Sequence, residues 1–335
     1  MLTPGYKLVV GKKAVDTTND PQTSTAVEIL VELDLDTPID RAVLTLGAVG
    51  GLQPAVDDPA TIALGYADES AGLTTVITAS VVAVDQGLET ARVTSYTAAN
   101  TLLRTFIDRS YQSKTAGAIV KDLANEGKVP VATADDGITF PGYVVDGRRS
   151  VYAHMRELAR LCGFDVYINP DGKLVFQKFN GGNAVHVFES GKHILSLDIL
   201  RAQPSAGSVV AWGESPTGSK GNDSWPWLTK DFSSSKGTSG TASPVQLLER
   251  PSLRTSDAAQ AAASAHELAI KQRTLTGKLL TIGRAEVKLG DAIALRGMTD
   301  TTLNTSFQVR SVRHRVTKDE GFTTLVGFRA ITVQQ

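Results

Sequence analysis

The chain has 335 residues, which is more than one ordinary domain needs, so we expect two or three packed units. Its formal net charge of −1, with 21% charged residues, gives no general attraction to nucleic acid or to an anionic membrane. The single cysteine, Cys162, excludes an internal disulfide, and neither a signal-peptide pattern nor an apolar run of about eighteen residues is present.

Residues 1–97 are predicted to form a β domain. Val27, Ile29 and Val31 open a run in which apolar residues alternate with mostly polar ones up to position 35, which predicts a long, half-buried strand. Further short strands are predicted at residues 41–46, 61–65, 74–84 and 89–95, separated by Gly, Asp and Pro clusters. Strands at this spacing are typical of a sandwich or a barrel.

Residues 98–180 are predicted to form an α/β unit. A short helical connector over 98–111 leads to a helix over 114–126, with Ser113 as its N-cap. A second helix, over 151–162, is predicted to begin after Ser150 and to end at Gly163, because glycine suits the left-handed conformation at a helix C-terminus. A β-hairpin follows, with strands at 164–168 and 173–176.

Residues 181–335 are predicted to form a second β domain with two additions. These are a flexible surface loop at 214–243, rich in Gly, Ser, Thr and Pro, and an alanine-rich helix over 257–273 that Ser256 caps. The later strands are expected at 278–282, 291–295, 306–316 and 321–333. The apolar positions of the strand 306–316 change parity, which predicts a β-bulge near Arg310 and Ser311. The fold class is therefore α+β and predominantly β.

No group of residues has the pattern of a catalytic, cofactor or metal site. Residues 213–220 resemble a phosphate-binding loop, but Ser219 and Lys220 stand in the wrong order. His266 and Glu267 begin a zinc-protease pattern, but Ile270 occupies the position of the second ligand. Asp34 and Asp36 share one face of the first long predicted strand with Glu28 and Glu32, and this face is interpreted as a solvated acidic face. We therefore expect no enzyme activity, no cofactor and no bound metal.

Five residues are candidate contacts to a partner. Arg310, Arg313 and Arg315 form a dense basic run within a predicted strand. Two interpretations stay open: a solvated edge, or a face that contacts a neighbouring subunit or a negative charge in a channel. Trp225 and Trp227 lie in the polar loop, where large aromatic side chains either pack onto the parent domain or anchor a partner.

The order of these segments resembles the late-control D family, the baseplate hub proteins of contractile phage tails, whose module also forms the hub part of type VI spike proteins. Three regions carry the resemblance, each by a set of short motifs. They are residues 61–66, 81–84 and 89–93; residues 115–126 and 151–176; and residues 288–293, 307–314 and 321–324. The resemblance therefore extends along nearly the whole chain.

The resemblance implies that 1–97 and 181–335 contain two tail-tube-like β-barrels and that three chains form a pseudo-sixfold ring. It implies a structural hub that joins the tail tube to a spike, and the spike is expected to be a separate protein because the chain ends soon after its last predicted strand. Expected partners are two further copies of the chain, the tube protein, the spike and other baseplate proteins. No membrane and no specific nucleic acid is expected as a partner.

On this interpretation the protein is made in a bacterial cytoplasm and incorporated into a virion or injection particle. The sequence does not distinguish a phage from a bacteriocin or a secretion system. Two alternatives stay open: a tail-associated cell-wall hydrolase, and a carbohydrate-binding adhesion module that only Trp225 and Trp227 support.

Overall fold

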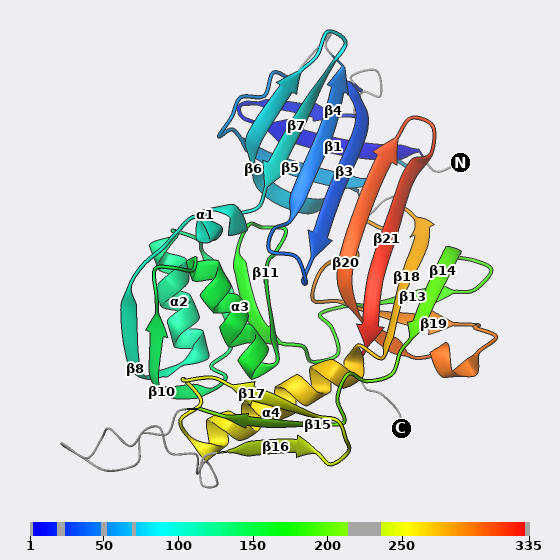
Figure 1. Cartoon of the computed structure of the whole chain (residues 1–335). Helices are drawn as coiled ribbons and strands as arrows, with labels where there is room; N and C mark the ends of the chain where they lie inside the picture. The colour runs from blue at the N-terminus through cyan, green and yellow to red at the C-terminus, as the bar shows by residue number, and fades with distance from the viewer. Residues whose placement is uncertain (1–2, 19–23, 48–51, 69–71, 214–235, 332–335) are drawn as a thin grey trace.

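The computed structural model describes residues 3–18, 24–47, 52–68, 72–213 and 236–331. Within these ranges the chain forms one sheet of 13 strands, three small sheets and four α-helices (Figure 1). The predicted fold class, α+β and predominantly β, is confirmed.

The first β region contains seven strands of the large sheet. They are β1 (Pro4–Val10), β2 (Lys13–Asp16), β3 (Ala26–Asp34), β4 (Arg41–Gly47), β5 (Pro59–Tyr66), β6 (Thr74–Gln86) and β7 (Thr90–Tyr96). Their order in the sheet is β3-β4-β7-β6-β5-β1-β2. The five strands predicted individually are present. The alternation along β3 has its expected cause, because Ile29 and Val31 are fully buried.

The second β region contributes the other six strands of this sheet. They are β13 (Val185–Glu189), β14 (Ile194–Arg201), β18 (Leu275–Ile282), β19 (Ala292–Arg296), β20 (Ser306–Thr317) and β21 (Gly321–Ala330). Their order is β14-β18-β21-β20, with β19 paired to β20 and β13 paired to β19. The predicted bulge is confirmed, because the register between β20 and β21 shifts between Val309 and Ser311.

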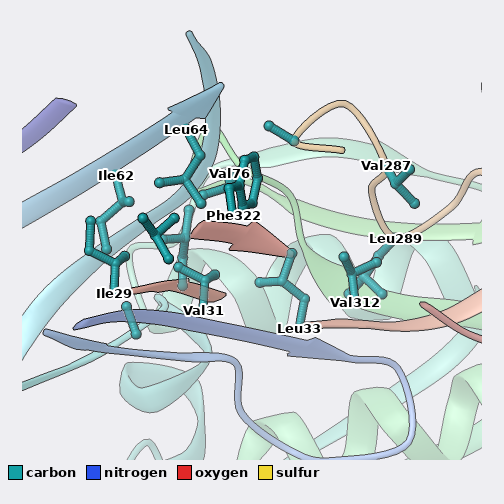
Figure 2. Close-up of a cluster of buried hydrophobic side chains, with 14 of the residues drawn as sticks. Ile29, Val31, Leu33, Ile62, Leu64, Val76, Val287, Leu289, Val312 and Phe322 are labelled. Atoms are coloured by element: carbon teal, nitrogen blue, oxygen red, sulfur yellow. The ribbon is translucent and has the colours of Figure 1, made fainter. Parts of the chain in front are cut away.

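The two β regions are joined into one sheet. Strand β20 pairs antiparallel with β3, so that Ser311 lies opposite Asp34 and Thr317 opposite Glu28. Side chains from both regions share one hydrophobic core; Figure 2 shows Val31 of β3 and Val312 of β20 in the same cluster. Among the described residues, no strand pairing closes either region into a separate barrel.

The two β regions repeat one topology. In chain order, β3, β4, β5, β6 and β7 of the first region correspond to β14, β18, β19, β20 and β21 of the second. In the sheet the first set runs β3-β4-β7-β6-β5, and the second set runs β14-β18-β21-β20-β19. The chain therefore contains the same five-stranded arrangement twice, side by side.

The α/β unit contains more strands than the sequence indicates. Its elements are α1 (Ala99–Leu103), β8 (Arg109–Thr115), α2 (Ala116–Glu126), β9 (Val131–Ala134), β10 (Thr139–Val145), α3 (Val151–Cys162), β11 (Phe164–Ile168) and β12 (Leu174–Lys178). The predicted caps of α3 are confirmed: the Ser150 hydroxyl accepts from the Ala153 N–H at 3.3 Å, and Gly163 has a φ of +69°. The predicted hairpin is β11–β12.

The start of the first predicted helix is wrong by two residues. Helix α2 begins at Ala116, and its N-cap is Thr115, whose hydroxyl accepts from the Ala118 N–H at 3.2 Å. Ser113 lies in β8, where its neighbours Gln112 and Lys114 pair with β10, and its φ of +51° is not the extended conformation of an N-cap residue. Tertiary pairing thus decides between two residues that are both good caps.

A second core lies outside the large sheet. Strands β15 (Ser208–Trp212), β16 (Gly237–Gly240) and β17 (Val245–Glu249) form a small sheet that packs on α4 (Ser256–Gln272). Together with α2 and α3 they share one hydrophobic cluster that includes Val120, Met155 and Ala263. Residues 206–213 and 236–272 therefore lie against the α/β unit. The division of the chain at 97 and 180 stays a proposal about domains.

Two predicted boundaries in this segment change. Strand β16 lies inside the loop predicted at 214–243, because Gly237 and its neighbours pair with β15. The rest of that loop up to residue 235, with Trp225 and Trp227, lies outside the described residues. Helix α4 begins one residue before the predicted start of 257, and its N-cap is Thr255 in place of Ser256.

Candidate functional site

The three predicted contact residues on β20 lie at the junction between β20 and β3. Arg313 stands directly opposite Glu32, with 2.6 Å between Nη2 and Oε1, and Arg41 of β4 binds the same carboxylate from the other side at 2.5 Å. Arg315 pairs with Glu28 at 2.8 Å and with Glu320 at 2.5 Å. Positive and negative side chains therefore alternate across three neighbouring strands.

Arg310 forms a separate, buried cluster. It occupies the bulge of β20, and its guanidinium is 2.9 Å from Asp165 of β11 and 2.6 Å from Asp36, which follows β3. The side chains of Arg310 and Asp165 are 12% and 8% exposed. Gln308 donates to the other oxygen of Asp165 and accepts from Arg329 Nε at 2.9 Å. The cluster joins the first β region, the second β region and the α/β unit.

Ion pairing outweighs burial at several of these groups. Burial raises the pKa of Asp36, but hydrogen bonding and attraction to Arg310 are stronger, so its pKa lies below the usual value. The pKa of Glu32 is also lowered, because the hydrogen bonds from two arginines exceed the effect of burial. At Arg329 burial prevails: together with the repulsion from Arg310 it lowers the pKa to about 10. These carboxylates therefore stay ionised at neutral pH.

The basic run does not lie on a sheet edge, although the side chains of Arg313 and Arg315 stay 53% and 41% exposed. Strand β20 is an interior strand with β21 on one side and β3 on the other, and all three arginines bind carboxylates of the same chain. The acidic face of β3 is likewise paired with arginines. Contact between these arginines and a partner stays a prediction, as it does for Trp225 and Trp227, which lie outside the described residues.

The histidines are engaged separately. His186 Nε2 lies 2.9 Å from Asp291, His314 Nδ1 lies 3.0 Å from the Thr324 hydroxyl, and His193 Nδ1 accepts from the Glu189 N–H. Burial lowers the pKa of His314 to about 3, which keeps its ring neutral. Across the described ranges, no three His, Cys, Asp or Glu side chains are grouped so that they could hold a metal ion.

A hollow of about 390 Å³ lies between the ends of β5 and β18. Its polar lining includes His193, Arg284 and Glu286, and the last two pair with each other at 3.2 Å. Its apolar lining includes Tyr66 and Phe322. The polar groups are bound to one another or to the backbone, and they do not converge on a point where a substrate atom would react.

Comparison with known proteins gives matches only among solved structures. No protein-family model matches the sequence, and no curated protein does. The 43 kDa tail protein of prophage MuSo2 from Shewanella oneidensis has a TM-score of 0.71 at 11% identity, over 97% of this chain and 98% of that one. A tail protein from Neisseria meningitidis MC58 has a TM-score of 0.72 at 12% identity, over 98% and 97%. The chain has the fold of these tail proteins.

The tail-protein fold also occurs in a component of the type VI secretion system of Escherichia coli, with a TM-score of 0.62 at 11% identity, over 97% of this chain and 77% of that one. The resemblance expected from the sequence is thus confirmed at the level of the fold. Because coverage is nearly complete, the α/β unit and residues 206–213 and 236–272 are part of the shared fold. None of the described helices is long and apolar enough to span a bilayer.

Proposed function

We propose that this chain is a structural hub of a contractile injection apparatus, in which three copies form a ring that joins the tail tube to a separate spike. The observation that carries the proposal is the internal repeat: one chain with a tail-protein fold holds the same five-stranded arrangement twice in one sheet. Three such chains supply six similar units, so a threefold assembly matches a sixfold tube.

The charged groups support a mechanical role. The three arginines of β20 form ion pairs with carboxylates on β3, on β11 and in the segment after β3, which link the two repeats to each other and to the α/β unit. A ring needs a fixed angle between its units, because closure depends on the rotation that each unit contributes. The role we propose is therefore structural and not enzymatic.

The proposed partners follow from this position. They are two further copies of the chain, the tube protein, the spike and other baseplate proteins, in a particle assembled from protein made in a bacterial cytoplasm. The proposal includes neither a membrane nor a specific nucleic acid as a partner.

Mass measurement tests the proposal directly. We expect native mass spectrometry to give three copies per assembly, either for the purified chain or for the chain together with its tube and spike proteins. Low-resolution imaging of whole particles should locate the chain on the axis, between tube and spike. A stable monomer that does not bind the tube in the presence of the spike would contradict the proposal.

A second experiment concerns the hydrolase alternative. In a zymogram against peptidoglycan, we expect no clearing by the purified chain. Clearing that persists after further purification would replace the structural proposal with an enzymatic one.

A further inference from the structure

Within the described residues, β14 and the second half of β6 are free backbone edges of the large sheet, in addition to one edge each of β2 and β13. Strand β14 ends the strand order and pairs only with β18. Strand β6 pairs with β7 along its second half, but β5 covers only its first half. On that side the last backbone bonds are made by Val81, whose N–H donates to Asp58 O at 2.9 Å and whose O accepts from Asp57 N at 2.8 Å. On that side, residues 82–86 therefore present unpaired N–H and C=O groups, seven positions away from β14 in the strand order (Figure 1).

The repeat shows what covers such edges. The equivalent of β6 is β20, and the equivalent of β14 is β3, and within the chain β20 and β3 pair with each other. The registers of the two repeats agree: Pro59 faces Ser80 as Ala292 faces Gln308, and Leu44 faces Val93 as Leu279 faces Val326. The β3–β20 pairing inside the chain therefore shows how the equivalent strands, β14 and β6, could pair between two chains.

Local irregularities confirm this equivalence. The register shift between Val81 and Ala83 of β6 matches the shift between Val309 and Ser311 of β20. The shift at Ala26 and Glu28 of β3 matches the one at Ile194 and Ser196 of β14. Before each bulge the same backbone bond forms, since Val309 N donates to Asp291 O at 3.0 Å as Val81 N does to Asp58 O. Bulges fix register, so they make the alignment unambiguous.

Apolar side chains are more deeply buried at the β3–β20 junction than at the equivalent positions of the two free edges. On β20, Val312 and Val316 are 1% and 9% exposed. The equivalent of Val312 on β6 is the half-buried Val84, and Leu88, in the turn after β6, is 100% exposed. On β3, Ile29 is fully buried, and its equivalent on β14, Leu197, is only half-buried. Ile199 of β14 is likewise only half-buried, whereas its equivalent on β3, Val31, is fully buried. The apolar side chains at the two free edges lack a covering strand.

We infer that β14 of one copy pairs antiparallel with the second half of β6 of the next copy, in the register of the β3–β20 junction. This places Leu200 opposite Asp85 and Ile199 opposite Gln86, with Leu197 next to Leu88 in the turn that follows β6. The inference rests on the proposed ring, and it names the surface through which the ring closes. Such an edge, left open, would pair indiscriminately, which gives the free chain a reason to assemble.

The two junctions differ in chemistry. At the positions equivalent to Arg313 and Glu32, the junction between chains has Asp85 and Leu200. The cross-strand ion pairs of the β3–β20 junction are therefore absent from it. The second junction depends on backbone hydrogen bonds and apolar burial, with exposed Leu195 and Leu200 at its margin. It should therefore resist salt that screens exposed ion pairs.

A cross-linking experiment tests the register. In a Cys162→Ser background, chains carrying Asp85→Cys are mixed with chains carrying Leu200→Cys, and a short thiol cross-linker is added. We expect a product of two chains in the mixture and none from either variant alone, because each junction needs one residue of each kind. A chain with both substitutions should give products of two and three chains and nothing larger.

A register control uses Gln86→Cys with Leu200→Cys. A slip of one residue places these side chains on opposite faces of the sheet, so we expect no cross-link. Assemblies of three copies that leave Asp85→Cys and Leu200→Cys unlinked would overturn this junction and leave the hub proposal standing. A chain that stays monomeric with tube and spike present would overturn both.

A second variant avoids any effect on folding. Leu88 is fully exposed in the single chain, so Leu88→Glu should leave the unfolding midpoint unchanged and reduce assembly by roughly tenfold or more. Val144→Glu is a matched control, because Val144 is 67% exposed on β10, away from both edges. Equal assembly of Leu88→Glu and the unchanged chain would overturn the junction.

Discussion

Arg310 is the residue on which most of the buried charge in this fold depends. Its guanidinium binds Asp36 and Asp165, and the ion pair with Asp165 is buried, with side chains 12% and 8% exposed. In Arg310→Met, Asp165 would stay buried without its cation, and removal of one partner from a buried pair costs about 3 kcal/mol or more. We expect urea unfolding to show a loss of that size.

Arg313→Ala is the matched control, because its side chain is 53% exposed and its pairing is screened by water. We expect its effect to stay within about 0.5 kcal/mol. The double variant Arg310→Met with Asp165→Leu should recover part of the loss, since the unpaired carboxylate is gone. A loss in Arg310→Met no larger than that in Arg313→Ala would show that Arg310 is not structurally important.

Asp40 gives the protein a dependence on pH near neutrality. Burial raises the pKa of this carboxyl to about 7, although its Oδ1 accepts from the Asp34 N–H at 2.7 Å. The folded state therefore holds a proton that the unfolded chain releases near pH 3.8. The contribution to stability is complete below about pH 4, declines as pH rises, and is lost above about pH 7.

Asp40→Asn mimics the protonated acid at every pH and retains the acceptor oxygen. We expect the variant to be more stable than the unchanged chain at pH 8, by at most about 4 kcal/mol, and equal to it at pH 4. Histidines with lowered pKa values, such as His154 and His266, act in the opposite direction, but they are present in both proteins and cancel. A constant difference across this range would contradict the assignment.

Single residues show how far the charged cluster could be predicted. The change of apolar parity along β20 predicts the bulge at Arg310, because it is a local property of one strand. The partners could not be predicted, since Asp36 and Asp165 lie 274 and 145 residues away in sequence. The cross-strand pairs of Arg313 and Arg315 likewise depend on a register that only the folded sheet specifies.

Elements with strong local sequence signals could be predicted, whereas elements that form only through pairing with a distant strand could not. Helix α3 has a cap at Ser150, an apolar face and a terminal Gly163, and all three signals are confirmed. Strands β8 and β16 carry few apolar residues and were missed, because pairing with β10 and β15 creates them. The start of α2 follows from the same cause, since the end of β8 selects Thr115 as the cap.

The cap of α2 can be tested by substitution. We expect Thr115→Ala to lower the free energy of unfolding by about 1 kcal/mol, because the Ala118 N–H loses its acceptor. Ser113→Ala should have almost no effect, since Ser113 is exposed in β8 and caps nothing in the structure. The reverse order of the two effects, measured by urea unfolding, would restore the cap predicted from the sequence.

The whole molecule is organised by two facts that no local pattern contains. The β3–β20 pairing merges the two predicted β regions into one sheet, and residues 206–213 and 236–272 pack on the α/β unit and complete its core. Both facts join segments distant in sequence, whereas the sequence patterns concern neighbours along the chain. The internal repeat was implied only through the family resemblance, because the two halves share topology and bulges without an evident sequence match.

The repeat also predicts how the protection of backbone amides changes on assembly. In the single chain, amides of β3 and of residues 311–317 in β20 are hydrogen-bonded at their junction, whereas β14 and residues 82–86 each have one free edge. Hydrogen exchange measured by mass spectrometry should therefore be slow at the first pair in both states. At the second pair it should be fast in the monomer and slow in the assembled ring, because the free N–H groups gain partners. Exchange at β14 that is equally fast before and after assembly would show that copies meet elsewhere, even though three copies come together.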